Sequence, residues 1–204
     1  MYTPSHYKNT NLAEVKEFLK QNSFGILVNQ LEGRPWATHI PLELSVDKDG
    51  NDILVGHVSK ANPQWKSFKD QGEVLAIFNG PHSYISSSWY QDEEVPTWNY
   101  VAVHVYGIVK ILSEAEVLAS LHQLVEKHEK VAKNPISLHH MSAETMNQVQ
   151  GIVGFQIAIT EIQATYKLSQ TRSQDHANII DELQHQEHSG AREIAEMMKN
   201  NTKK

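Results

Sequence analysis

A strand pattern with period two, followed by a tight turn and a second apolar run, most constrains how this chain can fold. From Trp36 to Val46 every even position carries an apolar residue or threonine, which predicts a strand with one face inward. Residues 47–51 read DKDGN and contain the residue types that a tight turn requires, so 53–58 return as the next strand. With the apolar run at 24–29, these segments predict an antiparallel meander.

More strands are predicted further along the chain, and helices flank them. The expected strands are 73–79, 82–88, 98–112, 151–160 and 162–166, with an irregularity near Glu161. The expected helices are 11–21 with an Asn11 cap, a short one after Pro63, 113–132 with a Ser113–Glu116 capping box, 143–149, and two more after Ser173 and Gly190. Because the elements do not alternate as βαβ units do, we expect a β-rich α+β fold, an antiparallel barrel with peripheral helices.

Length and composition exclude several classes of protein. The 204 residues suit a single domain over 1–204, with 173–204 as a C-terminal helical extension. No cysteine is present, so disulfides, zinc thiolate sites, iron–sulfur clusters and cysteine nucleophiles are excluded. No apolar run approaches the ~20 residues of a membrane helix, and the start of the chain does not resemble a signal peptide. We therefore expect a soluble cytoplasmic protein with no membrane partner and no metal site.

The stretch from Gly80 to Gly107 has an unusual mixture of side chains for strands that only fill a core. Its aromatic residues stand beside a run of serines and an asparagine, a combination that suits a flat amphipathic ligand with hydrogen-bonding edges. An ordinary hairpin whose aromatics pack into a barrel wall explains the same mixture. From this stretch alone, a binding site and a structural hairpin both stay open.

The segment 59–64, with sequence SKANPQ, places a helix start directly after a strand. Pro63 suits the first helical position and Asn62 suits the cap before it. Free backbone N–H groups at such a start attract anions such as phosphate, and Lys60 stands beside them. Many loops end this way, so the segment is a candidate anion site rather than a specific signature.

Six motifs in this order resemble the PaiB family, the FMN-binding negative transcriptional regulators. The motifs are THIPLEL (38–44), GHVSKANPQW (56–65), GPHSYISSSWY (80–90), VPTWNYVAVHVYG (95–107), GIVGF (151–155) and KLSQTRS (167–173). The resemblance extends over nearly the whole chain. It implies an FMN-binding split β-barrel, a homodimer with flavin sites in the cleft between subunits, and a role in lowering transcription.

The same resemblance implies a set of FMN-binding residues, and it implies no catalytic residue. His57, Lys60, Asn62 and Gln64 would lie near the flavin or its ribityl phosphate, and Thr97, Trp98 and Asn99 near the isoalloxazine edge. Ser86, Ser87 and Ser88 would supply hydroxyl donors, Trp89 a wall, and Lys167, Ser169 and Arg172 would reach a phosphate from the partner subunit. His39, on an otherwise apolar strand, completes the set.

Each of these assignments has a structural alternative. The two histidines His39 and His57 also suit half-buried barrel positions, Trp89 and Trp98 also suit a dimer interface, and Lys167 and Arg172 also suit a solvated surface. His104 is expected to be structural.

The function has alternatives as well. A flavin-dependent oxidoreductase of the pyridoxamine phosphate oxidase type, a haem-binding or haem-degrading relative, and a flavin-binding dimer without turnover all fit the fold that the resemblance implies. The net charge of −6 opposes direct DNA binding, so a regulator of this kind would act on DNA against its own field or through a regulatory protein partner.

Overall fold

In the computed structural model, which describes residues 1–70 and 72–201, seven strands form one open antiparallel sheet. Its strand order is β2-β1-β5-β6-β7-β4-β3. The strands are β1 Phe24–Leu31, β2 Arg34–Pro41, β3 Glu43–Val46, β4 Asp52–Ser59, β5 Glu73–Ile85, β6 Thr97–Ile111 and β7 Ile152–Lys167. The helices are α1 Leu12–Gln21, α2 Glu114–Glu129, α3 Ala143–Met146, α4 His176–His185 and α5 Ser189–Asn201, with 3₁₀ turns between them. The predicted β-rich antiparallel architecture is confirmed.

The described residues divide into two compact units, which are considered separately. The first unit comprises residues 1–17, 78–104 and 163–201, and the second comprises 18–70, 72–77 and 105–162. Strands β5, β6 and β7 belong in part to each unit. The prediction of a single domain over 1–204 stays a prediction.

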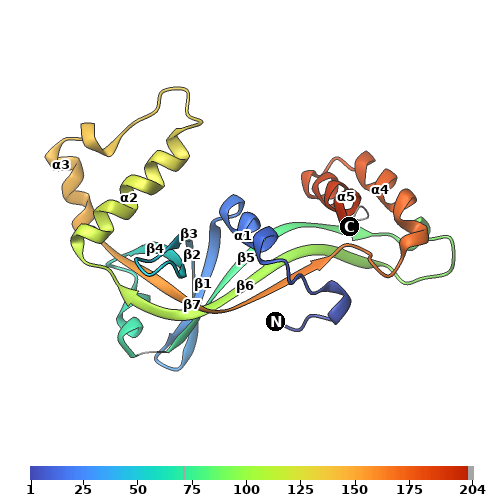
Figure 1. The fold of residues 1–204 in the computed structure, drawn as a ribbon, viewed down its shortest axis with the longest axis horizontal. Coiled ribbons are helices and arrows are strands. Elements are labelled where there is room, and N and C mark those ends of the chain that lie inside the picture. Colours follow the sequence, from blue (N-terminus) through green and yellow to red (C-terminus); the bar gives the residue numbers. More distant parts are fainter. Residues whose placement is uncertain (71, 202–204) are drawn as a thin grey trace. The chain divides into compact units, whose positions relative to one another are not determined.

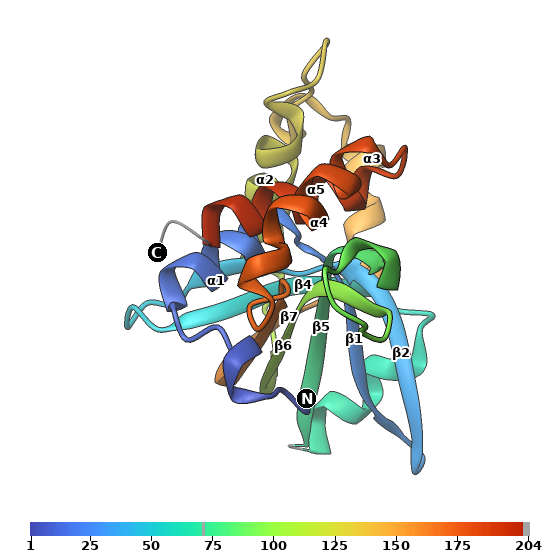
Figure 2. The same cartoon turned by 90° about the vertical axis from the view of Figure 1, so that its right-hand side faces the viewer.

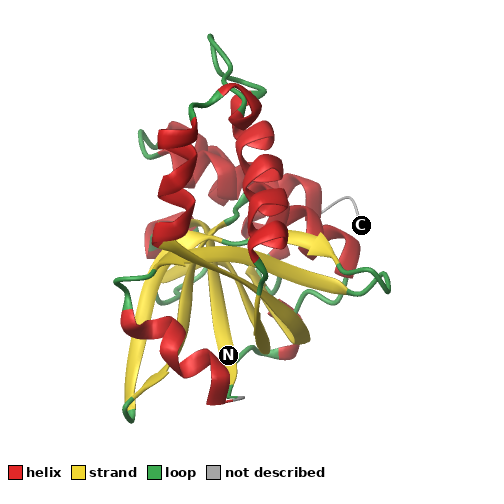
Figure 3. Cartoon of the chain, turned by 90° about the vertical axis from the view of Figure 1, so that its left-hand side faces the viewer, coloured by secondary structure: helices red, strands yellow, loops and turns green. Residues whose placement is uncertain are grey.

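The core of the second unit forms where α2 and the 3₁₀ helix η2 (Pro63–Asp70) cover the strands. Phe68 of η2 meets Phe155 of β7 edge-on, with ring centroids 5.1 Å apart, and both side chains are buried. Val117 of α2 packs directly on Gly154, where a Cβ atom would lie 2.4 Å from a valine methyl. Beyond α2 the chain folds back on itself to α3 (Figure 3). The capping box of Ser113 and Glu116 starts α2 as predicted.

The first unit is built around α4 and α5, which lie side by side in two views (Figures 1 and 2). Their buried side chains include Ile179, Leu183, Ile194 and Met198. Gly190 lies close to β5, since a Cβ atom at position 190 would lie 2.9 Å from the carbonyl oxygen of His82. A side chain at this position would therefore push α5 away from β5. In both described parts of the chain, no helix is long and apolar enough to cross a membrane.

The structure corrects several predicted boundaries. The predicted strand 36–46 is two strands, β2 and β3, which pair with different partners, β1 and β4. The predicted strands 73–79 and 82–88 form one strand, β5, and Ser87–Trp89 is a 3₁₀ turn. Strand β7 continues through position 161 as one element, and the alternation of buried and exposed residues is interrupted there, as predicted.

The last two helices also start differently from the prediction. Ser173 opens a 3₁₀ turn and caps no helix through its side chain, and Gly190 lies within the first turn of α5 instead of before it. Both errors arise because one serine or glycine signals several kinds of helix end.

Candidate functional site

A cavity of about 210 Å³ in the first unit collects five of the predicted site residues. It lies where β6 begins and β7 ends, beside the N-terminal segment. Its lining residues are Tyr7, Tyr90, Glu94, Val95, Thr97, Asn99, Lys167, Ser169, Thr171 and Arg172. Hereafter this space is called the Lys167 cavity.

Two cations, Lys167 and Arg172, give the Lys167 cavity its chemistry. The ammonium of Lys167 donates a hydrogen bond of 2.5 Å to the hydroxyl of Thr97 and lies 5.6 Å from the ring centroid of Tyr7. Burial lowers the pKa of Lys167. The guanidinium of Arg172 lies 5.8 Å from the ring centroid of Tyr90 and forms an ion pair with Glu94. The rings of Tyr7 and Tyr90 and the hydroxyl of Thr97 therefore keep the two cations at the same cavity.

The turn between the two cations has an unusual backbone. Ser169 has φ +58°, the left-handed region that residues other than glycine rarely adopt. Gln170 accepts a hydrogen bond from the N–H of Leu168 through its side chain, and the N–H of Arg172 donates to the carbonyl of Ser169 at 2.9 Å. The segment 167–172 is therefore a fixed turn, and it orders both cations before any ligand arrives.

Asn99 and Ser169 hold this turn against the strand. Asn99 is fully buried; its amide donates to the hydroxyl of Ser169 at 2.9 Å, and that hydroxyl donates back to the Asn99 oxygen at 3.2 Å. His176 Nε2 donates to the carbonyl of Ser169 at 2.8 Å, because a carbonyl oxygen can only accept. Asn99 and Ser169, both predicted to bind FMN, therefore mainly hold the turn in place, and only part of each side chain can face a ligand.

The other predicted residues of the first unit lie outside the lining of the Lys167 cavity. Ser86 and Ser88 bond to each other at 2.9 Å, and Ser86 caps the turn that contains Ser87, Ser88 and Trp89. Trp98, with 53% of its surface exposed, meets Tyr84 edge-on with ring centroids 5.9 Å apart. Because strand side chains alternate, Trp98 faces away from Thr97 and Asn99, on an open aromatic face.

In the second unit the loop after β4 is bonded mainly to itself and to neighbouring strands. Asn62 accepts from the N–H of Gln64 at 3.0 Å, as a cap should, and donates to Thr38 at 2.9 Å. Gln64 is fully buried and its side-chain amide donates to Leu27 and Asn29, while its side-chain oxygen accepts no hydrogen bond from the described residues. Lys60 has an exposed side chain and lines a separate space near Gly154.

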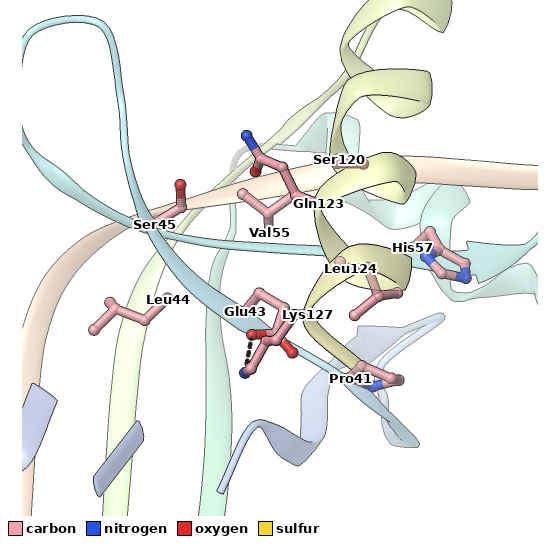
Figure 4. Close-up of a pocket in the computed structure, with 11 residues that line it drawn as sticks. Pro41, Glu43, Leu44, Ser45, Val55, His57, Ser120, Gln123, Leu124 and Lys127 are labelled. Atoms are coloured by element: carbon pink, nitrogen blue, oxygen red, sulfur yellow. Dashed lines mark hydrogen bonds and ion pairs between the residues drawn. The ribbon is translucent and has the colours of Figure 1, made fainter. Parts of the chain in front are cut away.

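His57 lines another cavity of the second unit, of about 180 Å³, between α2 and strands β3 and β4 (Figure 4). Burial lowers the pKa of His57, so the ring is neutral at pH 7. Glu43 and Lys127 form an ion pair of 2.5 Å across this cavity, and Lys127 also donates to the carbonyl of Lys20 at 3.0 Å.

His39 is exposed on β2. Its ring centroid lies 6.5 Å from that of Phe24.

Sequence reasoning missed Tyr7 and the role of Glu94 in the Lys167 cavity. Tyr7 lies 160 positions before Lys167 in the chain, and no local sequence pattern predicts a contact between residues so far apart. Glu94 stands in an acidic run before a proline, a pattern that is typical of loops and gives no sign of a site. Tyr90 lies in the aromatic stretch 80–107 described above, and that stretch was the sequence feature that could have pointed to Tyr90.

The chain matches a protein family and, over its full length, a bacterial relative. The family described as "Putative FMN-binding domain" matches residues 1–161. "Protease synthase and sporulation protein PAI 2" of Bacillus subtilis (strain 168) is 44% identical over 206 residues, which cover 100% of this chain and 99% of that protein. The segment 167–172 lies beyond the part that the family matches, but within the part aligned to the Bacillus protein.

Solved structures share the fold at low sequence identity. The FAD and haem binding protein from Mycobacterium smegmatis is 12% identical, with a TM-score of 0.62 over 79% of this chain and 73% of its own. The flavocytochrome Anf3 from Azotobacter vinelandii is 15% identical, with a TM-score of 0.58 over 78% of this chain and 69% of its own. These likenesses confirm the predicted split-barrel fold.

Proposed function

The chain belongs to the PaiB family of FMN-binding proteins, and from this membership we propose that it is a homodimeric, FMN-binding negative regulator of transcription. FMN is the cofactor of this family. When bound, FMN supplies reversible redox chemistry and a visible absorption band. The residues of this chain bind and orient it.

The observation that carries the proposal is the pair of cations in the Lys167 cavity. A phosphate monoester needs cationic donors and hydroxyl donors around its oxygens, and Lys167, Arg172 and Thr97 offer both in one small space. The fixed turn at Ser169 lowers the entropy cost of gathering them. We therefore assign the phosphate of FMN to this cavity.

The remaining predicted residues form a second set of proposed contacts. Trp98 offers an exposed aromatic face to the flat ring system. Lys60, His57 and His39 have accessible side chains in the second unit, whereas Asn62 and Gln64 act through the loop that they build. The three serines and Trp89 are proposed to contact FMN through the turn at 86–89.

For the regulatory role we propose action through a protein partner or through the state of the flavin. The net charge of −6 opposes tight binding to DNA, which is itself a polyanion. A flavin that changes charge and shape on reduction offers a signal that does not depend on DNA contact.

The first experiment is a visible absorption spectrum of the purified protein before and after addition of FMN and desalting. Retained flavin bands in stoichiometric amount support the proposal. A protein that takes up no FMN overturns the assignment of the cofactor site, and a haem Soret band moves the haem-binding alternative to first place. Steady-state oxidation of NAD(P)H above the rate of free FMN would instead favour the oxidoreductase.

The regulatory part needs separate tests of the assembly and of DNA binding. Sedimentation equilibrium of the flavin-loaded protein is expected to give a dimer, and a monomer at micromolar concentration would refute that part. A gel-shift titration over a range of salt concentrations tests direct DNA contact. Sequence-specific binding that persists at physiological salt would refute action through a partner alone.

A further inference from the structure

The two cations of the Lys167 cavity are in different situations, although both lie in the same fixed turn. Lys167 makes its hydrogen bond to a neutral hydroxyl, that of Thr97. Arg172 is already paired with the carboxylate of Glu94. Among the residues that the structure describes, no carboxylate pairs with Lys167, whereas Arg172 is neutralised by Glu94, so one of the two cations is available to an anion.

Glu94 is held in place from its own loop. One oxygen of its carboxylate accepts a hydrogen bond of 2.9 Å from the N–H of Val95, and the other pairs with Arg172. The side chain of Glu94 keeps 22% of its surface exposed, and Val95 beside it is 71% exposed. The segment 90–96 contains no helix or strand, so the carboxylate can turn out to water without breaking an element.

The charges show what this arrangement favours. With Glu94 in place, the cavity lining carries two cations and one carboxylate, a net charge of +1. A phosphate monoester carries a charge of about −1.5 to −2 at pH 7, which matches the +2 of Lys167 and Arg172 without Glu94. The carboxylate and the phosphate therefore compete for one guanidinium.

We propose that Glu94 is an internal anion that occupies the Arg172 side of the phosphate subsite, and that a phosphate monoester enters by displacing it. This inference rests on the proposed function, because it takes the Lys167 cavity as the place of the FMN phosphate. It adds a means of regulation: Glu94 neutralises Arg172 until a phosphate takes its place, and occupation of the subsite frees Glu94 and Val95, while Gln91 stays bonded to Gln174 and Asp175.

Binding of FMN and of riboflavin, which lacks the phosphate, separates the subsite from the rest of the flavin site. The full-length protein is titrated with each ligand by flavin fluorescence at low salt, and the ratio of the two dissociation constants is the readout. Glu94→Gln keeps the size of the side chain and removes its charge. Glu93→Gln is the matched control, because Glu93 is exposed and its replacement changes the net charge by the same amount.

The expected result is specific to the phosphate and to position 94. Glu94→Gln should raise the affinity for FMN about fivefold, because that factor corresponds to the free energy of a partly exposed ion pair. It should leave the affinity for riboflavin unchanged. Glu93→Gln should shift FMN by less than about twofold. Lys167→Met should remove most of the preference for FMN over riboflavin.

Two other outcomes have different meanings. If the unaltered protein prefers FMN, Lys167→Met abolishes that preference and Glu94→Gln does nothing, the internal anion is refuted while the phosphate subsite stands. If the unaltered protein binds FMN and riboflavin equally and Lys167→Met has no effect, the subsite itself is refuted, and the role of Glu94 falls with it.

Discussion

Replacement of Asn99 by alanine should destabilise the protein by about 3 kcal/mol, because the buried pair with Ser169 then loses one partner. Two hydrogen bonds are lost, at 2.9 and 3.2 Å, each contributing about 1 kcal/mol. The hydroxyl of Ser169, only 5% exposed, is left without its partner, which costs a further ~1 kcal/mol or more. The amide contact of 3.7 Å with the sulfur of Met198 is also lost.

The assay is urea denaturation followed by far-UV circular dichroism, with Asn99→Ala, Ser169→Ala and the double variant. Each single change removes the same pair, so the double variant should cost less than the sum, with a coupling free energy of about 1–2 kcal/mol. Asn79→Ala is the control, since that asparagine is exposed on β5 and should change stability by less than about 0.5 kcal/mol. A cost below 1 kcal/mol for Asn99→Ala, or strict additivity, would refute the role of the pair.

Three further changes test other parts of the structure. Gly107→Ala should lower the free energy of unfolding by about 3 kcal/mol or more in a thermal or urea melt, because the new Cβ atom would lie 2.4 Å from the carbonyl oxygen of Ala158. Gly151→Ala is the control and should be nearly neutral, because there is open space around that position. Equal effects of the two changes would contradict this explanation. Ser113→Ala should cost about 1 kcal/mol by removing the cap of α2, measured in the same melts. Lys127→Met should lower stability by about 1 kcal/mol at pH 7, and the difference should shrink in acid, where the hydrogen bond to the carbonyl of Lys20 is still lost; a difference independent of pH would exclude a contribution from the ion pair.

The pH dependence of the last change follows from the carboxyl of Glu43. Burial alone would raise its pKa, but hydrogen bonds from Lys127 and Ser23 outweigh burial and lower it below 4.5. A carboxyl with a lowered pKa in the folded state stabilises the protein above its unfolded pKa, and that stability is lost as the pH falls through the folded pKa. The part of the advantage of Lys127 that comes from its ion pair with Glu43 is therefore present at pH 7 and is lost in acid.

The local features of the fold could be predicted from the sequence because short-range chemistry decides them. The tight turn at 47–51 forms as predicted: the carboxylate of Asp47 accepts from the N–H of Asp49 at 2.9 Å, and Gly50 has φ +84°. The Ser113 cap and the Asn62 cap are likewise contacts between residues two or three positions apart. The division of 36–46 into β2 and β3 was missed, because alternation reports burial on one side of a strand but not which strand lies beside it.

The candidate site was predicted only in part, and for a similar reason. Lys167, Arg172 and Thr97 were singled out through the motifs that contain them, and the structure brings all three to one cavity. Asn99 and Ser169 were expected to face a ligand, yet they mainly face each other. Tyr7 and Glu94 enter the cavity from distant segments, and only a three-dimensional arrangement of the chain can show that.

The open sheet leaves two edges, β2 and β3, whose backbone groups could pair with strands of other molecules. Strand β3 has only four residues, too short a template for stable addition. Strand β2 has eight, but Pro35 and Pro41 remove two of its N–H donors and Arg34 adds a charge at its start. Replacing both prolines should therefore restore two N–H donors to β2 and favour intermolecular sheet at high protein concentration.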